Sequence, residues 1–186
     1  MDVLEAIHRR RATREFTDEP VSVPAISRLI DAAIWAPSAV DQQPWLFTVI
    51  RDQTLLDKIS TESKKHMLAE MAGDSGHAAF RDHLTNPTFH IFYHAPVLIL
   101  ISAIEQGGWG IEDAALAAEN LMLAATAEGL GTCWIGFAQR WLGSNEARKL
   151  IDLPSNYLPV APIIVGHPRA AIAPIPRRTP RVHWIG

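Results

Sequence analysis

Two groups of arginines lie near opposite ends of the 186-residue chain: Arg10, Arg11 and Arg14 at the start, and Arg177 and Arg178 near the end. Planar guanidinium groups match the oxygens of a phosphate in bidentate geometry, so convergence of the two groups would create a phosphate site. Each group would equally suit a solvated helix end or a basic tail. The local sequence leaves both interpretations open.

A second candidate site is the polar loop Ala-Pro-Ser-Ala-Val-Asp-Gln-Gln-Pro-Trp at residues 36–45. It offers backbone donors, the Ser38 hydroxyl and two carboxamides. Pro37 and Pro44 restrict its shape at low entropic cost, as a preformed polar pocket requires. A plain connection between a helix and a strand would have a similar composition. The loop alone does not decide between the two.

A third candidate is the glycine-bounded segment at residues 129–137, Gly-Leu-Gly-Thr-Cys-Trp-Ile-Gly-Phe. Glycines beside a short apolar strand permit close approach to a flat ligand, although a helix end followed by a core strand would look the same. It is not a dinucleotide fingerprint, because the G-x-G-x-x-G spacing and a preceding strand are missing. Cys133 within it is interpreted as a packed thiol, and His90 and His94 as ordinary histidines rather than metal ligands.

Composition excludes several classes of protein. The net charge is −3, yet residues 153–186 hold four Arg and no acid, so the middle of the chain is acidic and makes a poor nucleic-acid surface. The longest apolar stretch, around residues 95–104, is too short for a membrane helix. A single Cys and a 48% hydrophobic composition indicate a cytoplasmic globular protein, and residues 1–186 are predicted to form one domain.

Periodicity predicts helices that surround a small sheet, which is an α+β architecture. The capping residues Asp2 and Ser22 open the first two helices, and Ser144 opens a late short one that runs through Ile151. Residues 73–94 fit no periodic pattern and are expected to form a mobile excursion. The remaining predicted elements are strands at 45–50, 96–103, 132–137 and 158–165, helices at 55–73 and 112–128, and an extended tail from Gly166.

Taken in order, these segments resemble the FMN-dependent nitroreductase family over almost the whole chain. The resemblance rests on Arg10-Arg11-Ala12-Thr13-Arg14-Glu15-Phe16, on Ala-Pro-Ser at 36–38 and Gln-Pro-Trp at 43–45, and on Ala-Pro at 95–96. It continues with Asn-Leu-x-Leu at 120–123, the glycine-bounded segment at 129–136, Gly-x-Pro at 166–168, and Arg178 before His-Trp at 183–184. Each motif is weak alone, but their shared order is specific.

The resemblance implies a nitroreductase-like fold with a central, mostly antiparallel sheet and a homodimer that exchanges its C-terminal extensions. Two FMN sites would lie at the subunit interface. Arg10, Arg14 and Arg178 would hold the FMN phosphate, Arg11 and Ala12 would follow the ribityl chain, and the loop after Pro37 would come from the partner. The implied cofactor-binding residues are Arg10, Arg11, Ala12, Arg14, Pro37, Ser38, Ala39, Asp41, Gln43, Trp134, Ile135, Gly136 and Arg178.

The implied chemistry is that of the cofactor: a hydride from NADH or NADPH reaches FMN, and a nitro compound, quinone or similar acceptor then takes the same place, which gives ping-pong kinetics. No catalytic side chain and no metal are implied. Asp41 stands where the family usually has Asn, so a carboxylate replaces a neutral amide near the flavin. The alternative function is a non-catalytic module that binds or senses a flavin or another anion.

Overall fold

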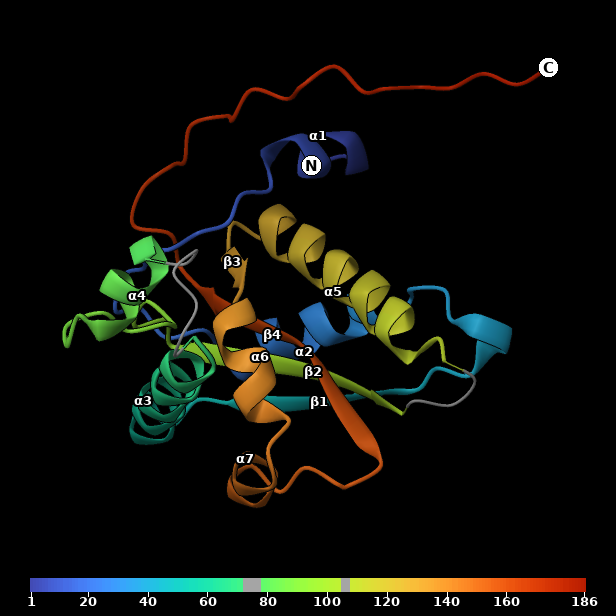
Figure 1. Cartoon of the computed structure of the whole chain (residues 1–186). Coiled ribbons are helices and arrows are strands. Elements are labelled where there is room, and N and C mark those ends of the chain that lie inside the picture. The colour runs from blue at the N-terminus through green and yellow to red at the C-terminus, as the bar shows by residue number, and fades with distance from the viewer. Residues whose placement is uncertain (72–77, 105–107) are drawn as a thin grey trace.

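The computed structural model describes residues 1–71, 78–104 and 108–186, and its centre is a four-stranded sheet (Figure 1). The strands are β1 (Trp45–Ile50), β2 (Val97–Ile104), β3 (Gly131–Trp134) and β4 (Tyr157–Gly166). They lie in the order β1-β2-β4-β3, and every neighbouring pair is antiparallel. The predicted antiparallel sheet within an α+β fold is therefore confirmed.

The two central strands are β2 and β4, and both are apolar along almost their full length. Their residues are nearly all buried, as expected for strands covered on both faces. Neither Pro159 nor Pro162 breaks β4. The register shift between Ile101 and Ser102 lies beside Pro159, whereas Pro162 stays in regular register opposite Leu100.

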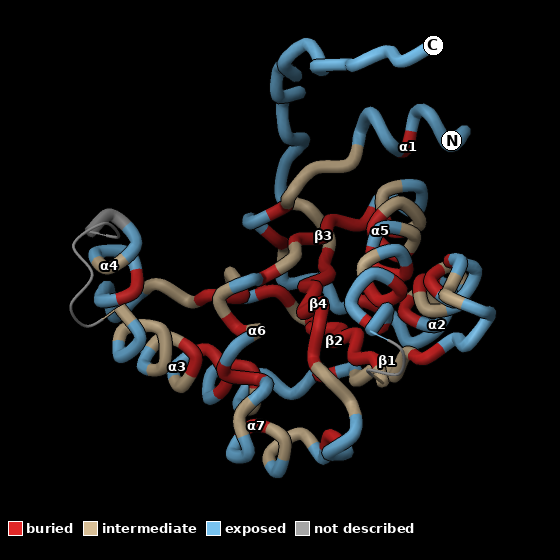
Figure 2. Tube along the Cα trace, turned by 45° about the vertical axis from the view of Figure 1, so that its right-hand side comes forward, coloured by how far each residue is buried: buried red, intermediate tan, exposed pale blue. Residues whose placement is uncertain are grey.

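Helices cover both faces of the sheet (Figure 1). On one face, α2 (Val23–Ala33) packs against the alanine-rich α5 (Gly110–Ala127), whose small side chains allow close approach to β2 and β4. On the other face lie α3 (Gln53–Glu70) and α6 (Gly136–Leu142). Figure 2 shows the resulting buried centre, with exposed residues concentrated in α1, α4 and the C-terminal tail.

Local capping explains where several helices begin. The side chain of Asp2 accepts a hydrogen bond from the backbone N–H of Glu5 and starts α1 (Val3–Arg9). Ser22 and Ser144 do the same for α2 and α7 (Asn145–Leu150), as predicted. Within the described ranges, no helix is both long and apolar enough to cross a membrane.

Two predicted boundaries are wrong. The strand predicted at 132–137 ends at Trp134, because residues from Gly136 onward form α6, a helix too short to show clear periodicity. The described part of the segment 73–94 contains α4 (Ala78–Thr85) and the fully buried Ile91 and Phe92, so it is a packed part of the fold rather than an excursion. The part of that expectation that falls on 73–77 lies outside the described residues.

Candidate functional site

The arginine motif forms an extended segment beside β3. Ala12 forms a parallel bridge with Thr132, and the backbone N–H of Thr13 donates to the Thr132 carbonyl at 2.8 Å. Successive side chains of an extended segment point to opposite sides. Arg14 accordingly lines one cavity, whereas Arg11 and Thr13 line a different one.

Arg14 contributes the cationic group to a cavity of about 320 Å³ between α3, β3 and α6. Its guanidinium carbon lies 5.9 Å from the centre of the Tyr93 ring, within the range of a cation–π contact. A Cβ atom built on Gly136 would meet nothing within 4 Å, so the backbone there faces open space. The lining residues are Arg14, Met67, Tyr93, Cys133, Trp134, Ile135, Gly136 and Phe137.

A second cavity, of about 460 Å³, adjoins the first through the shared residues Met67, Gly136 and Phe137. Its wall is aromatic, because the Phe80 and Phe137 rings meet edge to face with their centres 6.1 Å apart. At its rim Arg140 pairs with Glu70 at 3.1 Å. The two adjoining cavities thus share an apolar wall, with Arg14 at one side and the Arg140–Glu70 pair at the other cavity's rim.

Positive charge also surrounds the β3 side of this site. Arg10 forms an ion pair with Glu119 at 3.4 Å and keeps about a quarter of its side chain exposed. Burial raises the pKa of the Cys133 thiol, while the nearby Arg14 and Arg10 act in the opposite direction. The thiol is therefore protonated near neutral pH and is a poor nucleophile.

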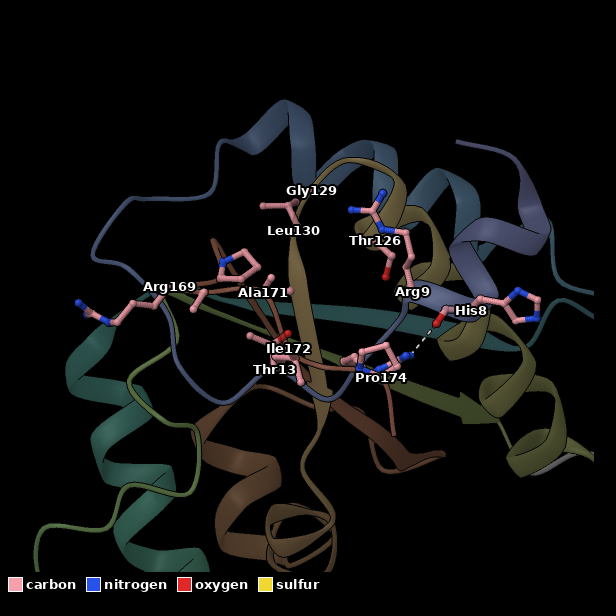
Figure 3. A pocket seen from close by; sticks show the side chains of 14 residues that line it. His8, Arg9, Thr13, Thr126, Gly129, Leu130, Arg169, Ala171, Ile172 and Pro174 are labelled. Carbon is pink, nitrogen blue, oxygen red and sulfur yellow. Dashed lines mark hydrogen bonds between the residues drawn. The ribbon is translucent and has the colours of Figure 1, made fainter. Parts of the chain in front are cut away.

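Arg11 belongs to a separate cavity of about 650 Å³, shown in Figure 3. Its guanidinium donates to the carbonyls of His8 and Arg10, each at 2.7 Å. The cavity lies between the end of α5 and the first residues of the C-terminal tail. The Arg169 side chain points away from the other labelled residues (Figure 3) and donates to the Phe16 carbonyl. The Arg11 side chain is thus held by hydrogen bonds within its own segment. Only the backbone of Arg11 can then contact a ligand in the cavity that Arg14 lines.

The loop 37–43 lies apart from the arginine cavity within one chain. Its 3-10 turn, η1 (Ala39–Asp41), lies on the opposite side of the molecule from α3 and α4 (Figure 1). The single chain therefore does not bring Pro37, Ser38, Ala39, Asp41 and Gln43 together with Arg14.

The same loop holds an unusual backbone. Val40, Asp41 and Gln43 have φ angles of 49°, 55° and 48°, in the left-handed region that non-glycine residues rarely adopt. Each such residue costs about 1–3 kcal/mol and persists only where its surroundings fix it. Here the Ser38 hydroxyl accepts from the backbone N–H of Gln43 at 2.9 Å, and the Asp41 carboxylate accepts from the Gln43 amide at 2.9 Å.

Arg178 lies in the tail, in which every residue from 169 to 186 is exposed. The tail leaves the sheet beyond β4 and runs past α1 (Figure 1). Within the described residues, Arg178 makes no hydrogen bond or ion pair. One chain therefore brings Arg10, Ala12, Arg14, Trp134, Ile135 and Gly136 into one region, but it does not add the loop or Arg178.

Two residues of the site had no signal in the sequence. Met67 and Tyr93 line the Arg14 cavity, but neither belongs to a motif, whereas Phe137, on the same cavity, ends the glycine-bounded segment 129–137. Asp113 had no distinct signal either, because an acid in the first turn of a helix is ordinary, and its exposed neighbour Glu112 carries the same charge. It accepts a hydrogen bond from the backbone N–H of Ala39 at 3.0 Å.

Comparison with known proteins identifies the family. The profile of the nitroreductase family matches residues 7–167. A protein of Methanothermobacter thermautotrophicus, whose name pairs NADH dehydrogenase with NAD(P)H nitroreductase, is 33% identical over 172 residues, which cover 90% of this chain and 78% of that protein. An FMN reductase [NAD(P)H] of Bacillus subtilis is 28% identical over 189 residues, 95% of this chain and 70% of that protein. A nitroreductase with bound FMN from Bacteroides fragilis superposes with a TM-score of 0.82 at 26% identity, over 100% of this chain and 98% of that one. The chain belongs to the nitroreductase family.

Proposed function

We propose that the protein is an FMN-dependent oxidoreductase that uses NADH or NADPH to reduce a nitro compound, a quinone or a similar flat acceptor. The observation that carries the proposal is the open backbone at Gly136 between two joined cavities, with the Arg14 guanidinium at one side. Relatives named for NAD(P)H nitroreductase and FMN reductase activity support the same reaction class.

The residues present fit the ring of FMN. Met67, Tyr93 and Phe137 supply apolar surface for a flat heterocycle, and no atom of the described residues lies within 4 Å of a Cβ built on Gly136. Arg14, which the resemblance assigns to the phosphate, would instead supply a positive charge at one edge of the ring, because it lines the same cavity as Gly136. There it would favour the electron density that the ring gains on reduction. Bound FMN supplies hydride and electron transfer, so the chain itself needs only to hold the ring and admit its partners.

The phosphate end of FMN requires additional cations, because a phosphate monoester carries a charge of about −1.5 to −2 near neutral pH. Arg10 is the nearest candidate in the same chain, because its positive charge, like that of Arg14, acts on Cys133 and so lies on the same side of the arginine segment. Arg178 would complete the phosphate site once the tail is ordered in a dimer. The pairing of Arg10 with Glu119 would then compete with the phosphate for the guanidinium.

A homodimer would bring the missing parts together. Large apolar side chains are exposed around the loop, including Trp35 at 80%, Val40 at 89% and Trp109 at 56%. The tail also exposes Trp184 at 87% and Ile185 at 90%. Exposed apolar groups of this size mark interaction surfaces. We infer that the loop 37–43 meets the flavin of the partner subunit and that the two subunits exchange their tails. A cytoplasmic location of the protein stays a prediction.

The joined cavity would receive the electron donor and the acceptor in turn. The edge-to-face pair of Phe80 and Phe137 gives an apolar wall for a flat aromatic or quinoid ring. Because the hydride would pass through the bound FMN itself, we assign no catalytic side chain. Donor and acceptor that share one place give ping-pong kinetics.

The test is reconstitution followed by steady-state assays. The purified protein, saturated with FMN and gel-filtered, should retain close to one FMN per chain and oxidise NADH or NADPH when a nitroaromatic or quinone is supplied. Parallel lines in double-reciprocal plots at several acceptor concentrations would support the ping-pong order. Protein that loses all added FMN during gel filtration would contradict the proposal, and protein that retains FMN without turnover would indicate a binding module.

A further inference from the structure

Asp113 occupies a position where a carboxylate is costly. It lies in the first turn of α5 and is only 4% exposed, and its neighbours on the buried side of the helix are alanines. The helix N-terminus favours a negative charge there, but the second carboxylate oxygen is buried and, within the described residues, makes no hydrogen bond. A buried acid retained at such a position must serve some other requirement.

Within the described residues, the Asp113 side chain makes one hydrogen bond, and that bond leads to the strained loop. Oδ1 accepts from the backbone N–H of Ala39 at 3.0 Å, across 74 residues of sequence. The side-chain hydrogen bonds that Gln43 donates to Ser38 and Asp41 lie within the loop, so they fix its shape but not its place on the body. Asp113 ties the start of the turn to α5, and the backbone bond from Ile104 to the Pro44 carbonyl at 3.0 Å ties its end to β2.

The same face of α5 also holds α2, the helix that precedes the loop. Asn120 stands seven residues after Asp113, about two helical turns further along, and its side-chain amide donates to the Ala32 carbonyl near the end of α2 at 3.3 Å. Two polar residues on a largely apolar helix thus fix both α2 and the loop that follows it.

We propose that Asp113 is a positioning residue for the flavin of the partner subunit, acting through the Ala39 N–H to hold the left-handed loop 38–43 against that flavin. The inference rests on the proposed function, because it needs the loop to meet FMN across the dimer. It adds that a residue of one subunit, far from its own Arg14 cavity, sets FMN affinity in the other.

Three variants separate the hydrogen bond from general stability. Asp113→Ala removes the acceptor, and we expect FMN to bind ~10-fold more weakly, the effect of one buried hydrogen bond. Asp113→Asn keeps an oxygen acceptor and should bind FMN within ~3-fold of the unaltered protein. Glu112→Ala, an exposed neighbour in the same turn, is the matched control and should not change FMN affinity.

If Asp113→Ala does not fold, Ala39→Pro tests the same bond from the other side. Proline has no N–H, and Ser38 has φ −136° and ψ 153°, an extended backbone that tolerates a following proline. This variant leaves the carboxylate in place and should weaken FMN binding by the same ~10-fold. FMN affinity equal to that of the unaltered protein in a folded Asp113→Ala or Ala39→Pro variant would overturn the inference.

A heterodimer shows which subunit Asp113 serves. One chain carries Arg10→Ala and Arg14→Ala, and the other, with a different affinity tag, carries Asp113→Ala. If Asp113 acts across the interface, both defects fall on one site and the other site is intact, so the heterodimer should bind one FMN with unaltered affinity. If Asp113 acts within its own chain, each site carries a defect and no tight site remains, which would overturn the inference. Failure of the unaltered homodimer to bind FMN would instead overturn the proposed function.

Discussion

The guanidinium of Arg14 lies over the ring of Tyr93, with 5.9 Å between the guanidinium carbon and the ring centre. This contact joins the N-terminal arginine segment to the segment after α4, two parts of the chain with α2, β1, α3 and α4 between them. Because both side chains line the cavity beside Gly136, the pair defines one edge of the proposed flavin site.

Replacement of Arg14 by Ala should weaken FMN binding by ~10- to 100-fold, since it removes a charge-assisted contact. The dissociation constant, obtained by titrating apoprotein against FMN fluorescence, is the measurement. Arg9→Ala is the control, because Arg9 is an exposed arginine paired with Glu5 on the helix surface. Equal FMN affinity for the two variants would remove Arg14 from the site.

Gly136→Ala should separate function from folding. In the part of the chain that the structure describes, a Cβ atom there meets nothing within 4 Å, so the melting temperature should stay within about 2 °C of the unaltered protein. The methyl group would enter the proposed ring site, so FMN affinity or turnover should fall by at least ~10-fold. Unchanged turnover would place the ring elsewhere.

Gly131→Ala, at the start of β3, is the contrasting variant. Its Cβ would lie 2.6 Å from Oγ1 and 2.8 Å from Cβ of Thr13, so the arginine segment would have to shift. We expect a loss of about 1–3 kcal/mol in the free energy of unfolding, measured by urea denaturation. A variant as stable as the unaltered protein would show that the packing of Thr13 on β3 is looser than the structure indicates.

Asp41→Asn tests the carboxylate in the loop. The Asn side chain can still accept from the Gln43 amide, so the local hydrogen bond is kept while one negative charge is removed. The reduction potential of bound FMN should rise by on the order of 10 mV, because a charge near the ring opposes its gain of electrons. Potentiometric titration gives the value, with Asp31→Asn on α2 as the control. A potential that does not change would show that Asp41 lies away from the flavin.

His90 should make stability depend on pH. Burial, followed by the nearby His94, lowers the pKa of His90 below its ordinary value of 6.5, although Asp57 acts in the opposite direction. At a pH between the lowered pKa of His90 in the folded protein and the ordinary value of 6.5, the unfolded chain binds more protons than the folded one. The free energy of unfolding therefore falls as the pH drops below about 6.5. Unfolding of His90→Gln at pH ~8 and ~5.5 should show a smaller loss between the two than the unaltered protein does. An equal loss in both proteins would assign the pH dependence to other groups.

The sequence was sufficient for the elements whose signals are local. Asp2, Ser22 and Ser144 cap the helices that they were predicted to cap, because capping depends on only three or four residues. The continuous apolar run of β2 and the alanine-rich α5 were recognisable for the same reason. The motifs also identified the family, because their order along the chain is specific although each motif alone is weak.

The features that the sequence did not reveal depend on tertiary contacts. Strand and helix meet between Trp134 and Gly136, and only pairing with β4 determines where the strand ends. Arg11 and Arg14 appear equivalent in the motif, but the alternation of an extended segment sends them into different cavities. None of the left-handed loop residues is a glycine, so the sequence carried no signal for their backbone conformation.

The interpretation of residues 1–186 as a single domain stays a prediction.

The most direct test of the account is anaerobic stopped-flow mixing of the FMN-loaded protein with NADH and, separately, with NADPH. The account predicts that one or both donors bleach the flavin absorbance rapidly and that a nitroaromatic or quinone added afterwards restores it. Flavin that stays oxidised with both donors would contradict the assignment as an NAD(P)H-dependent oxidoreductase.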